Sequence, residues 1–167
     1  EFFLRPAAQL TGKTFLLGGA GWADKRMPAN VRAIGHVATS LHNAFNASAL
    51  AVLNVARESM AAIGYSPATR VFEAAGAGAC LITDAWEGIE LFLEPDEEVL
   101  VARDGNDVVE HLAALTPARA RAIGECARAR ILAEHTYDLR AAIVDRLFRA
   151  ALARKRAGAP VQRPEAA

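Results

Sequence analysis

Residues 70–84 read RVFEAAGAGACLITD, and this stretch decides the fold class. Its first half belongs to a segment, Pro67–Ala77, whose composition is typical of a helix. Its second half contains Cys80–Thr83, a short apolar run that predicts a buried strand. The small residues between them predict a tight turn. A helix that passes through a short turn into a buried strand is the repeating unit of an α/β fold.

Further apolar runs of strand length flank this stretch on both sides. The predicted strands are Thr14–Leu17, Val31–Ile34, Ala49–Val55 and Glu98–Ala102. The run at Ala49–Val55 is nearly continuous, which is typical of a central strand that is buried on both faces. We therefore expect Leu16, Leu53 and Leu81 to lie in neighbouring buried strands of a single parallel sheet.

Helical segments alternate with these runs and then close the chain. The remaining predicted helices are Ser40–Ala47, Asp107–Leu115, Pro117–Glu134 and Tyr137–Arg154. The pair Thr116-Pro117 is a typical helix start, because a capping hydroxyl precedes a proline in the first turn. The alternation predicts a Rossmann-like, doubly wound α/β fold with a mainly parallel sheet flanked by helices.

The composition suits one domain and excludes several classes of protein. The 167 residues carry 19 basic and 19 acidic side chains, which argues against a general nucleic-acid binder. No apolar run reaches the roughly 20 residues of a membrane span. Cys80, Cys126 and the four histidines show no metal-ligand spacing, so no metal site is predicted and a reducing cytoplasm fits. We expect residues 1–155 to form the domain and residues 156–167 a disordered tail.

Open α/β sheets bind ligands at the carboxyl ends of their strands. One loop there contains Gly64-Tyr65-Ser66-Pro67, in which Ser66 is a good N-cap and Pro67 a good first-turn residue. The helix start at Ser66–Thr69 would present free N–H groups to a phosphate or diphosphate. The alternative is an ordinary capped helix without a ligand.

Charged residues near this helix start are the remaining candidates. Arg70 would add charge against phosphate, and Glu73 would accept hydrogen bonds from ribose hydroxyls. The alternative is a solvated ion pair, since the two are neighbours on the helix. Because Glu73 lies between apolar residues, we expect it to be partly buried with a partner. Arg57 and His36, which follow predicted strands, fit ligand-binding loops and ordinary surface positions equally well.

The stretch from Arg70 to Asp84 resembles the carboxyl-terminal donor-binding domain of group 1 glycosyltransferases, in particular the spore-maturation CgeB-like branch. Gly35-His36-Val37, Leu53-Asn54-Val55, Glu94-Pro95 and Glu134-His135-Thr136-Tyr137 carry the same likeness. The likeness extends from about Phe15 to Leu147.

The resemblance implies half of a two-domain GT-B enzyme that binds a nucleoside-diphosphate sugar as its donor, without a further cofactor. It also implies an amino-terminal partner domain and an acceptor that the sequence does not identify. Glu73 matches the family's ribose-binding glutamate, whereas Tyr65 stands where an earlier glutamate is common. No catalytic base is assigned. The alternatives are a nucleotide-sugar epimerase, with His36 or Glu87 as acid or base, and a non-catalytic nucleotide-binding or assembly module. Trp86 either lines the sugar pocket or packs.

Overall fold

The computed structural model describes residues 1–22 and 24–157. The chain divides into two compact units, Glu1–Leu132 and Ala133–Ala167, which are described separately. The first unit carries every strand of the described residues and all the candidate site residues. The tail expected over residues 156–167 lies outside the described residues, apart from its first two positions.

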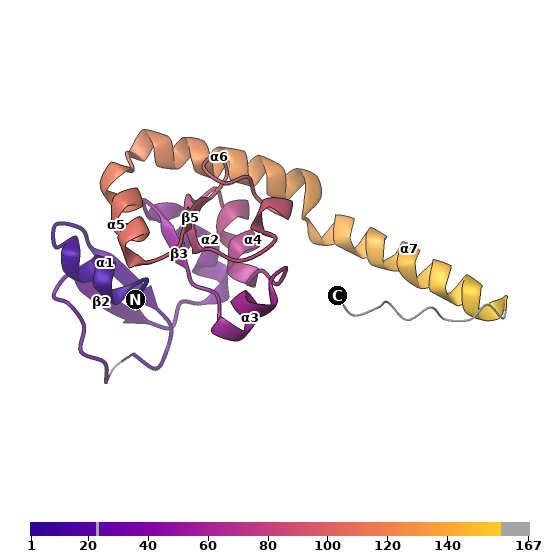
Figure 1. Ribbon diagram of the computed structural model, residues 1–167, viewed down its shortest axis with the longest axis horizontal. Coiled ribbons are helices and arrows are strands. Elements are labelled where there is room, and N and C mark those ends of the chain that lie inside the picture. Colours follow the sequence, from indigo (N-terminus) through magenta and orange to yellow (C-terminus); the bar gives the residue numbers. More distant parts are fainter. Residues whose placement is uncertain (23, 158–167) are drawn as a thin grey trace. The chain divides into compact units, whose positions relative to one another are not determined.

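The first unit contains two parallel sheets (Figure 1). The strands of the described residues are β1 (Phe15–Gly18), β2 (Val31–Gly35), β3 (Val52–Asn54), β4 (Leu81–Asp84) and β5 (Leu100–Ala102). Strand β1 pairs with β2, and the other sheet has the order β3-β4-β5. All three pairings are parallel. The predicted alternation of strands and helices, and the mainly parallel pairing, are therefore confirmed.

Helices connect and cover these strands. Those of the first unit are α1 (Leu4–Gln9), α2 (His42–Ser48), α3 (Glu58–Ile63), α4 (Thr69–Gly76), α5 (Gly105–Ala114) and α6 (Pro117–Glu134), with short 3-10 turns at Thr39–Leu41 and Ile89–Leu91. Figure 1 shows α6 passing from the side of α5 to the side of α4. The last two residues of α6 belong to the second unit.

The core lies on both faces of the β3-β4-β5 sheet. Leu81 packs in one hydrophobic cluster with residues of α4 and α6, whereas the next residue, Ile82, packs in a second cluster with residues of α5 and α6. Successive side chains of a strand point to opposite faces of a sheet, so β4 is covered on both sides. All four residues of β4 are buried. This is the doubly wound arrangement that the sequence predicts.

Three expectations about the sheet are wrong. The strands form two sheets rather than one, and Leu16 in β1 is 46% exposed instead of buried. Strand β3 lies at the edge of its sheet, and β4 is the middle strand. An apolar run signals burial but carries no information about strand order. The hydrophobicity of residues 49–55 therefore could not distinguish an edge strand beside an apolar cavity from a central one.

Side-chain caps determine where the later helices begin. At the start of α5, Asp104 Oδ1 accepts hydrogen bonds from the backbone N–H groups of Asn106 (2.7 Å) and Asp107 (3.1 Å). At the start of α6, Thr116 Oγ1 accepts from the N–H of Arg119 at 3.2 Å. These bonds satisfy donors that a helix leaves free at its first turn. The helix start expected at Thr116-Pro117 is confirmed.

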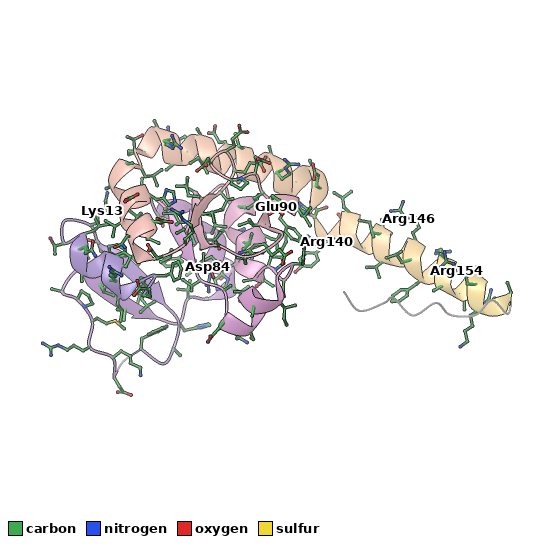
Figure 2. The ribbon with its side chains drawn as sticks, in the orientation of Figure 1. Lys13, Asp84, Glu90, Arg140, Arg146 and Arg154 are labelled. Atoms are coloured by element: carbon green, nitrogen blue, oxygen red, sulfur yellow. The ribbon has the colours of Figure 1, made fainter. Side chains whose placement is uncertain are left out.

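The second unit consists, in its described part, of the end of α6 and helix α7 (Tyr137–Arg156). Thr136 caps α7 by accepting a hydrogen bond from the N–H of Leu139. None of the residues of α7 is buried. Arg146 and Arg154 project from it (Figure 2).

Candidate functional site

A cavity of about 990 Å³ lies between the two sheets of the first unit. Residues of β1 and of β3 line it, including Leu16, Leu17 and Leu53. Strand β1 pairs only with β2 and β3 only with β4, so each is an edge strand of its sheet, and residues of both line the same cavity. The volume falls in the range of about 300–1,000 Å³ that is usual for ligand pockets.

Three of the six predicted site residues meet in this cavity. His36 follows β2, whereas Arg70 and Glu73 lie on α4, and all three line the cavity. The other three, Arg57, Ser66 and Thr69, are not among its lining residues. The structure thus brings together a histidine, a cation and a carboxylate from two separate segments of the chain.

Arg70 and Glu73 are exposed, which corrects the expectation that Glu73 is partly buried with a partner. In the described part of the chain neither side chain has a hydrogen bond or an ion pair. The reason is the helical period, because Val71, Ala74 and Ala75 form the buried face of α4. Glu73 has apolar neighbours in the sequence but lies on the other face. Both charged groups are therefore free to bind a ligand.

The start of α4 also differs from the prediction. The N-cap is Ala68, with φ −66° and ψ 148°, and α4 begins at Thr69. Pro67 fixes its own φ, and the chain stays extended through Ala68, so Ser66 lies too far upstream to cap. No side chain caps this helix. The first-turn N–H groups of Thr69 and Arg70 are consequently not satisfied by a capping side chain.

A buried polar network ties together the carboxyl ends of β3 and β4. Asn54 Nδ2 donates to Thr83 Oγ1 at 3.0 Å, and this hydroxyl donates to Asp84 Oδ1 at 3.2 Å. The same carboxylate oxygen accepts from the backbone N–H of Ala56 at 2.9 Å. Figure 2 labels Asp84, which is only 7% exposed. The network fixes the loop that leads to Arg57, an exposed residue at the N-cap of α3.

Tyr65 and Glu87 form a second polar pair after α3 and β4. The Tyr65 hydroxyl donates to Glu87 Oε1 at 2.9 Å, and the Tyr65 N–H donates to the Glu87 carbonyl at 2.7 Å. The hydrogen bond to Glu87 raises the pKa of the Tyr65 phenol. A Cβ on Gly88 would collide with the Tyr65 ring, so only glycine fits there. Sequence reasoning missed this pair, since 22 residues separate its members.

Trp86 packs rather than lining a pocket. It is 8% exposed and its ring centroid lies 6.0 Å from that of Phe92. The aromatic residues that do line the cavity are Trp22, which is 40% exposed, and three phenylalanines, Phe3, Phe15 and Phe45. Asn46 of α2 lines it too and is 8% exposed. Sequence reasoning missed them as site residues, although Trp22 directly follows the glycine-rich end of β1.

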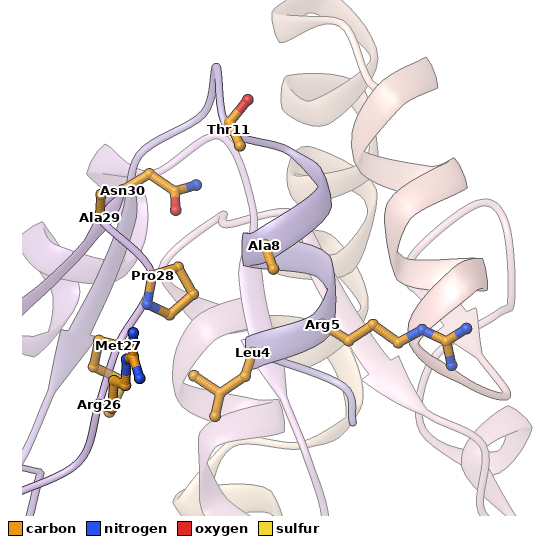
Figure 3. Close-up of a pocket in the computed structure, with 9 residues that line it drawn as sticks. All are labelled: Leu4, Arg5, Ala8, Thr11, Arg26, Met27, Pro28, Ala29 and Asn30. Carbon is orange, nitrogen blue, oxygen red and sulfur yellow. The ribbon is translucent and has the colours of Figure 1, made fainter.

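A second cavity, of about 670 Å³, lies beside α1 (Figure 3). Leu4, Ala8, Met27 and Pro28 contribute apolar walls. Arg5 turns away from Pro28 in this view, and it forms an ion pair with Glu1 at 2.7 Å. None of the predicted site residues lines this cavity, so the cavity between the sheets is the better candidate.

The chain matches one protein family and is similar to solved glycosyltransferase structures. The sequence profile of the family described as glycosyl transferase-like matches residues 1–145. Sucrose-phosphate synthase from Thermosynechococcus elongatus is similar in structure, with a TM-score of 0.72 and 20% identity over 91% of this chain. AviGT4, a glycosyltransferase involved in avilamycin A biosynthesis, gives a TM-score of 0.49 and 23% identity over 75% of this chain.

The chain spans 42% of the length of each of these two structures. The likeness to sucrose-phosphate synthase supports the Rossmann-like half-domain fold. No curated protein sequence matches the chain. Among the described residues, no helix has both the length and the apolar character to cross a membrane.

Proposed function

We propose, because the chain belongs to the glycosyl transferase-like family, that it is the donor-binding half of a two-domain GT-B glycosyltransferase. Its donor is a nucleoside-diphosphate sugar, and the acceptor is not identified. The observation that carries this proposal is the convergence of His36, Arg70 and Glu73 on one cavity of nucleotide size. Their side chains are exposed, and none has a hydrogen bond or ion pair with another described residue.

The α4 side of the cavity has the charges that a nucleoside diphosphate needs. The Arg70 side chain and its uncapped backbone N–H group would bind the diphosphate at the start of α4. Glu73 would accept hydrogen bonds from the ribose hydroxyls. A helix rises about 1.5 Å per residue, which puts Glu73 roughly 6 Å along the axis from Thr69. This spacing suits a ribose that follows its diphosphate along the helix.

Glycosyl transfer requires stabilisation of the departing nucleoside diphosphate. Positive groups that are fixed before the reaction stabilise the negative charge as it develops on the leaving group. Arg70 and the α4 amides have this role in the proposal, which needs no metal ion. Arg57, Ser66 and Thr69 lie outside the cavity wall in the described structure, and we assign them secondary contacts with the phosphates. The catalytic base remains unassigned, and an amino-terminal partner domain would complete the cleft.

Two further parts of the proposal, the branch of the family and the cellular location, rest on sequence features. The segments Gly35-His36-Val37 and Glu94-Pro95 support the spore-maturation CgeB-like branch of the family. Cys80 and Cys126 are both free thiols, which supports a cytoplasmic location.

Calorimetry with four nucleoside diphosphates, namely UDP, ADP, GDP and dTDP, tests the proposal. We expect residues 1–167 to bind at least one of them and to release no sugar from the corresponding sugar nucleotide. Arg70→Ala should weaken binding about tenfold or more, because a charge-assisted hydrogen bond contributes about 1.5–3 kcal/mol. Arg121→Ala is the matched control, since Arg121 is exposed on α6 and does not line the cavity.

Three results would contradict the proposal in different ways. Failure of the wild-type chain to bind any of the four nucleotides would remove the nucleotide site. Equal weakening by Arg70→Ala and Arg121→Ala would remove the assignment to this cavity. With the amino-terminal half supplied, binding without transfer would favour a non-catalytic module, and inversion of a sugar centre would favour an epimerase.

A further inference from the structure

We propose that helix α7 binds the surface of a membrane that contains anionic lipids, with one apolar face of the helix in the lipid and its axis along the surface. This inference goes beyond the proposed function, because it concerns the second unit and does not depend on the donor site. It assigns an interaction surface to this helix and names the chemistry of the partner that fits it.

Large apolar side chains form a stripe along α7. Six of them are between 40% and 71% exposed, and none of the residues of α7 is buried. Residues four apart lie above one another on a helix, and the six form two such rows side by side. This apolar stripe consists of Leu139, Ile143 and Leu147 in one row and Val144, Phe148 and Leu152 in the other. A contiguous exposed surface of this kind marks a site that binds a membrane or another protein.

The charged residues of α7 are distributed unequally around the apolar stripe. A turn of about 3.6 residues places Arg140, Arg154 and Lys155 on the same side of the helix as the stripe. Both acidic residues of α7, Asp138 and Asp145, lie on the opposite side. The side that carries the apolar stripe therefore carries positive charge without any negative charge from α7.

The helix is basic although the whole chain is neutral. Residues 137–156 contain six basic and two acidic side chains, which is a net charge of +4, so the other residues, with 13 basic and 17 acidic side chains, carry −4. A helix with a basic excess and an apolar stripe is typical of helices that lie in the interface of a membrane. Basic side chains near an anionic leaflet add to the binding that the apolar groups provide.

A lipid surface fits this combination better than the dry face of a partner protein. Burial of Arg140, Arg154 and Lys155 in a protein interface would require carboxylates to pair with them, because an unpaired buried charge is costly. At a membrane surface, the long side chains of Arg and Lys extend from the apolar region to the headgroups and stay hydrated. The lipid phosphates supply the opposite charge there. Asp138 and Asp145 face water, away from those phosphates.

Co-sedimentation of residues 1–167 with lipid vesicles tests the apolar stripe. Binding to vesicles of equal parts phosphatidylcholine and phosphatidylglycerol should be about tenfold or more stronger than binding to phosphatidylcholine alone, and added salt should weaken it. Phe148→Glu should weaken binding about tenfold or more with little change in Tm, because the side chain is 71% exposed. Ile63→Glu is the matched control, since Ile63 of α3 is 77% exposed and lies outside α7, and it should retain binding.

Two double variants test the orientation of the helix. Arg154→Gln with Lys155→Gln removes two positive charges beside the apolar stripe and should weaken vesicle binding about tenfold or more. Arg146→Gln with Arg149→Gln removes the same charge from the opposite side and should weaken binding about threefold or less. Equal losses from the two pairs would show attraction by net charge without a fixed orientation, and would overturn the proposal.

Further results would overturn the proposal and show what covers the stripe instead. Absence of binding, or equal binding to both kinds of vesicle, would exclude an anionic membrane surface. Loss of vesicle binding when the amino-terminal half is added to the chain would assign the stripe to that domain. A dimer that Phe148→Glu dissociates in the absence of vesicles would assign the stripe to a second copy.

The donor site is tested separately from this inference. Phe148→Glu should leave nucleotide binding unchanged, and Arg70→Ala should leave vesicle binding unchanged. If the chain binds vesicles but no nucleoside diphosphate, the proposed function fails and the membrane surface stands. If it binds a nucleoside diphosphate but no anionic vesicle, the membrane surface fails and the donor site stands.

Discussion

The β3-β4-β5 sheet and the β1–β2 sheet have similar apolar strand sequences but very different burial. Leu81 and Ile82 in β4 are 0% and 1% exposed, whereas Leu16 in β1 is 46% exposed and Ile34 in β2 is 45% exposed. Helices cover both faces of the first sheet, and the second has a cavity beside it. The difference suggests a division of roles: the β3-β4-β5 sheet forms most of the closed core of the first unit, while the β1–β2 sheet borders the cavity that we propose as the donor site.

The largest expected effect is the contrast between one leucine in each sheet. Leu81→Ala should lower the free energy of unfolding by about 2–5 kcal/mol, because it leaves a cavity in a closed core. Leu16→Ala should lower it by less than about 1 kcal/mol, since the side chain is already half in solvent. Chemical denaturation of both variants measures the difference. Equal losses would show that the two sheets contribute alike to stability.

Two glycines allow a similar comparison between a tightly packed position and an open one. A Cβ on Gly124 of α6 would collide with the backbone carbonyl of Gly78, just before β4, whereas Gly12 has open space around it. Gly124→Ala should therefore destabilise the chain by about 1–3 kcal/mol. Gly12→Ala should be neutral or stabilise by up to about 1 kcal/mol, because it reduces the freedom of the unfolded chain. Thermal unfolding of both variants provides the comparison, and a stable Gly124→Ala variant would contradict the packing of α6 on this turn.

The dependence of stability on alkaline pH tests the burial of the Cys80 thiol beside the β3-β4-β5 sheet. Burial raises the pKa of Cys80 to about 11, while an unfolded thiol ionises near pH 8.5–9. Between about pH 9 and 11 the unfolded chain therefore binds fewer protons than the folded one, and stability falls as pH rises. The contribution of Cys80 to the slope of unfolding free energy against pH should approach but not exceed about 1.4 kcal/mol per pH unit. Cys80→Ala should reduce this slope.

Cys126 is the control for that experiment, because its thiol is exposed on α6. Cys126→Ala should leave the slope of stability against pH unchanged. If the wild type and both variants show the same slope from pH 9 to 11, the thiol of Cys80 is not protected by the core.

The predictability of the fold follows the same division between the sheets. The buried half was predictable, because the sequence of β4 and the capped starts of the later helices depend on local chemistry. The order of the strands was not predictable. The apolar run at residues 49–55 indicates contact with apolar surroundings, but it does not indicate which strand lies in the middle of the sheet. The exposure of Leu16 depends on a cavity that no local pattern reveals.

The site was predictable only where a residue lies next to a recognisable element. The sequence indicates Arg70 and Glu73 as candidates through the helix that carries them, but their exposure depends on which face of α4 meets the core. The pair of Tyr65 and Glu87 and the cavity position of Asn46 depend on tertiary contacts between distant segments. Ser66 was assigned as a cap because local sequence cannot show that the chain stays extended to residue 68.

The central claim is that the α4 side of the cavity binds the ribose and diphosphate of a nucleotide, and Glu73→Gln tests it most directly. Calorimetry should show nucleoside diphosphate binding about tenfold weaker, or about 1.4 kcal/mol, because the neutral amide loses charge-assisted acceptance from the ribose hydroxyls. Tm should hardly change, since Glu73 is exposed and has no partner among the described residues. Glu125→Gln, on the exposed face of α6, should change neither quantity. Unchanged nucleotide affinity together with a large loss of Tm would contradict the account and make Glu73 a structural residue.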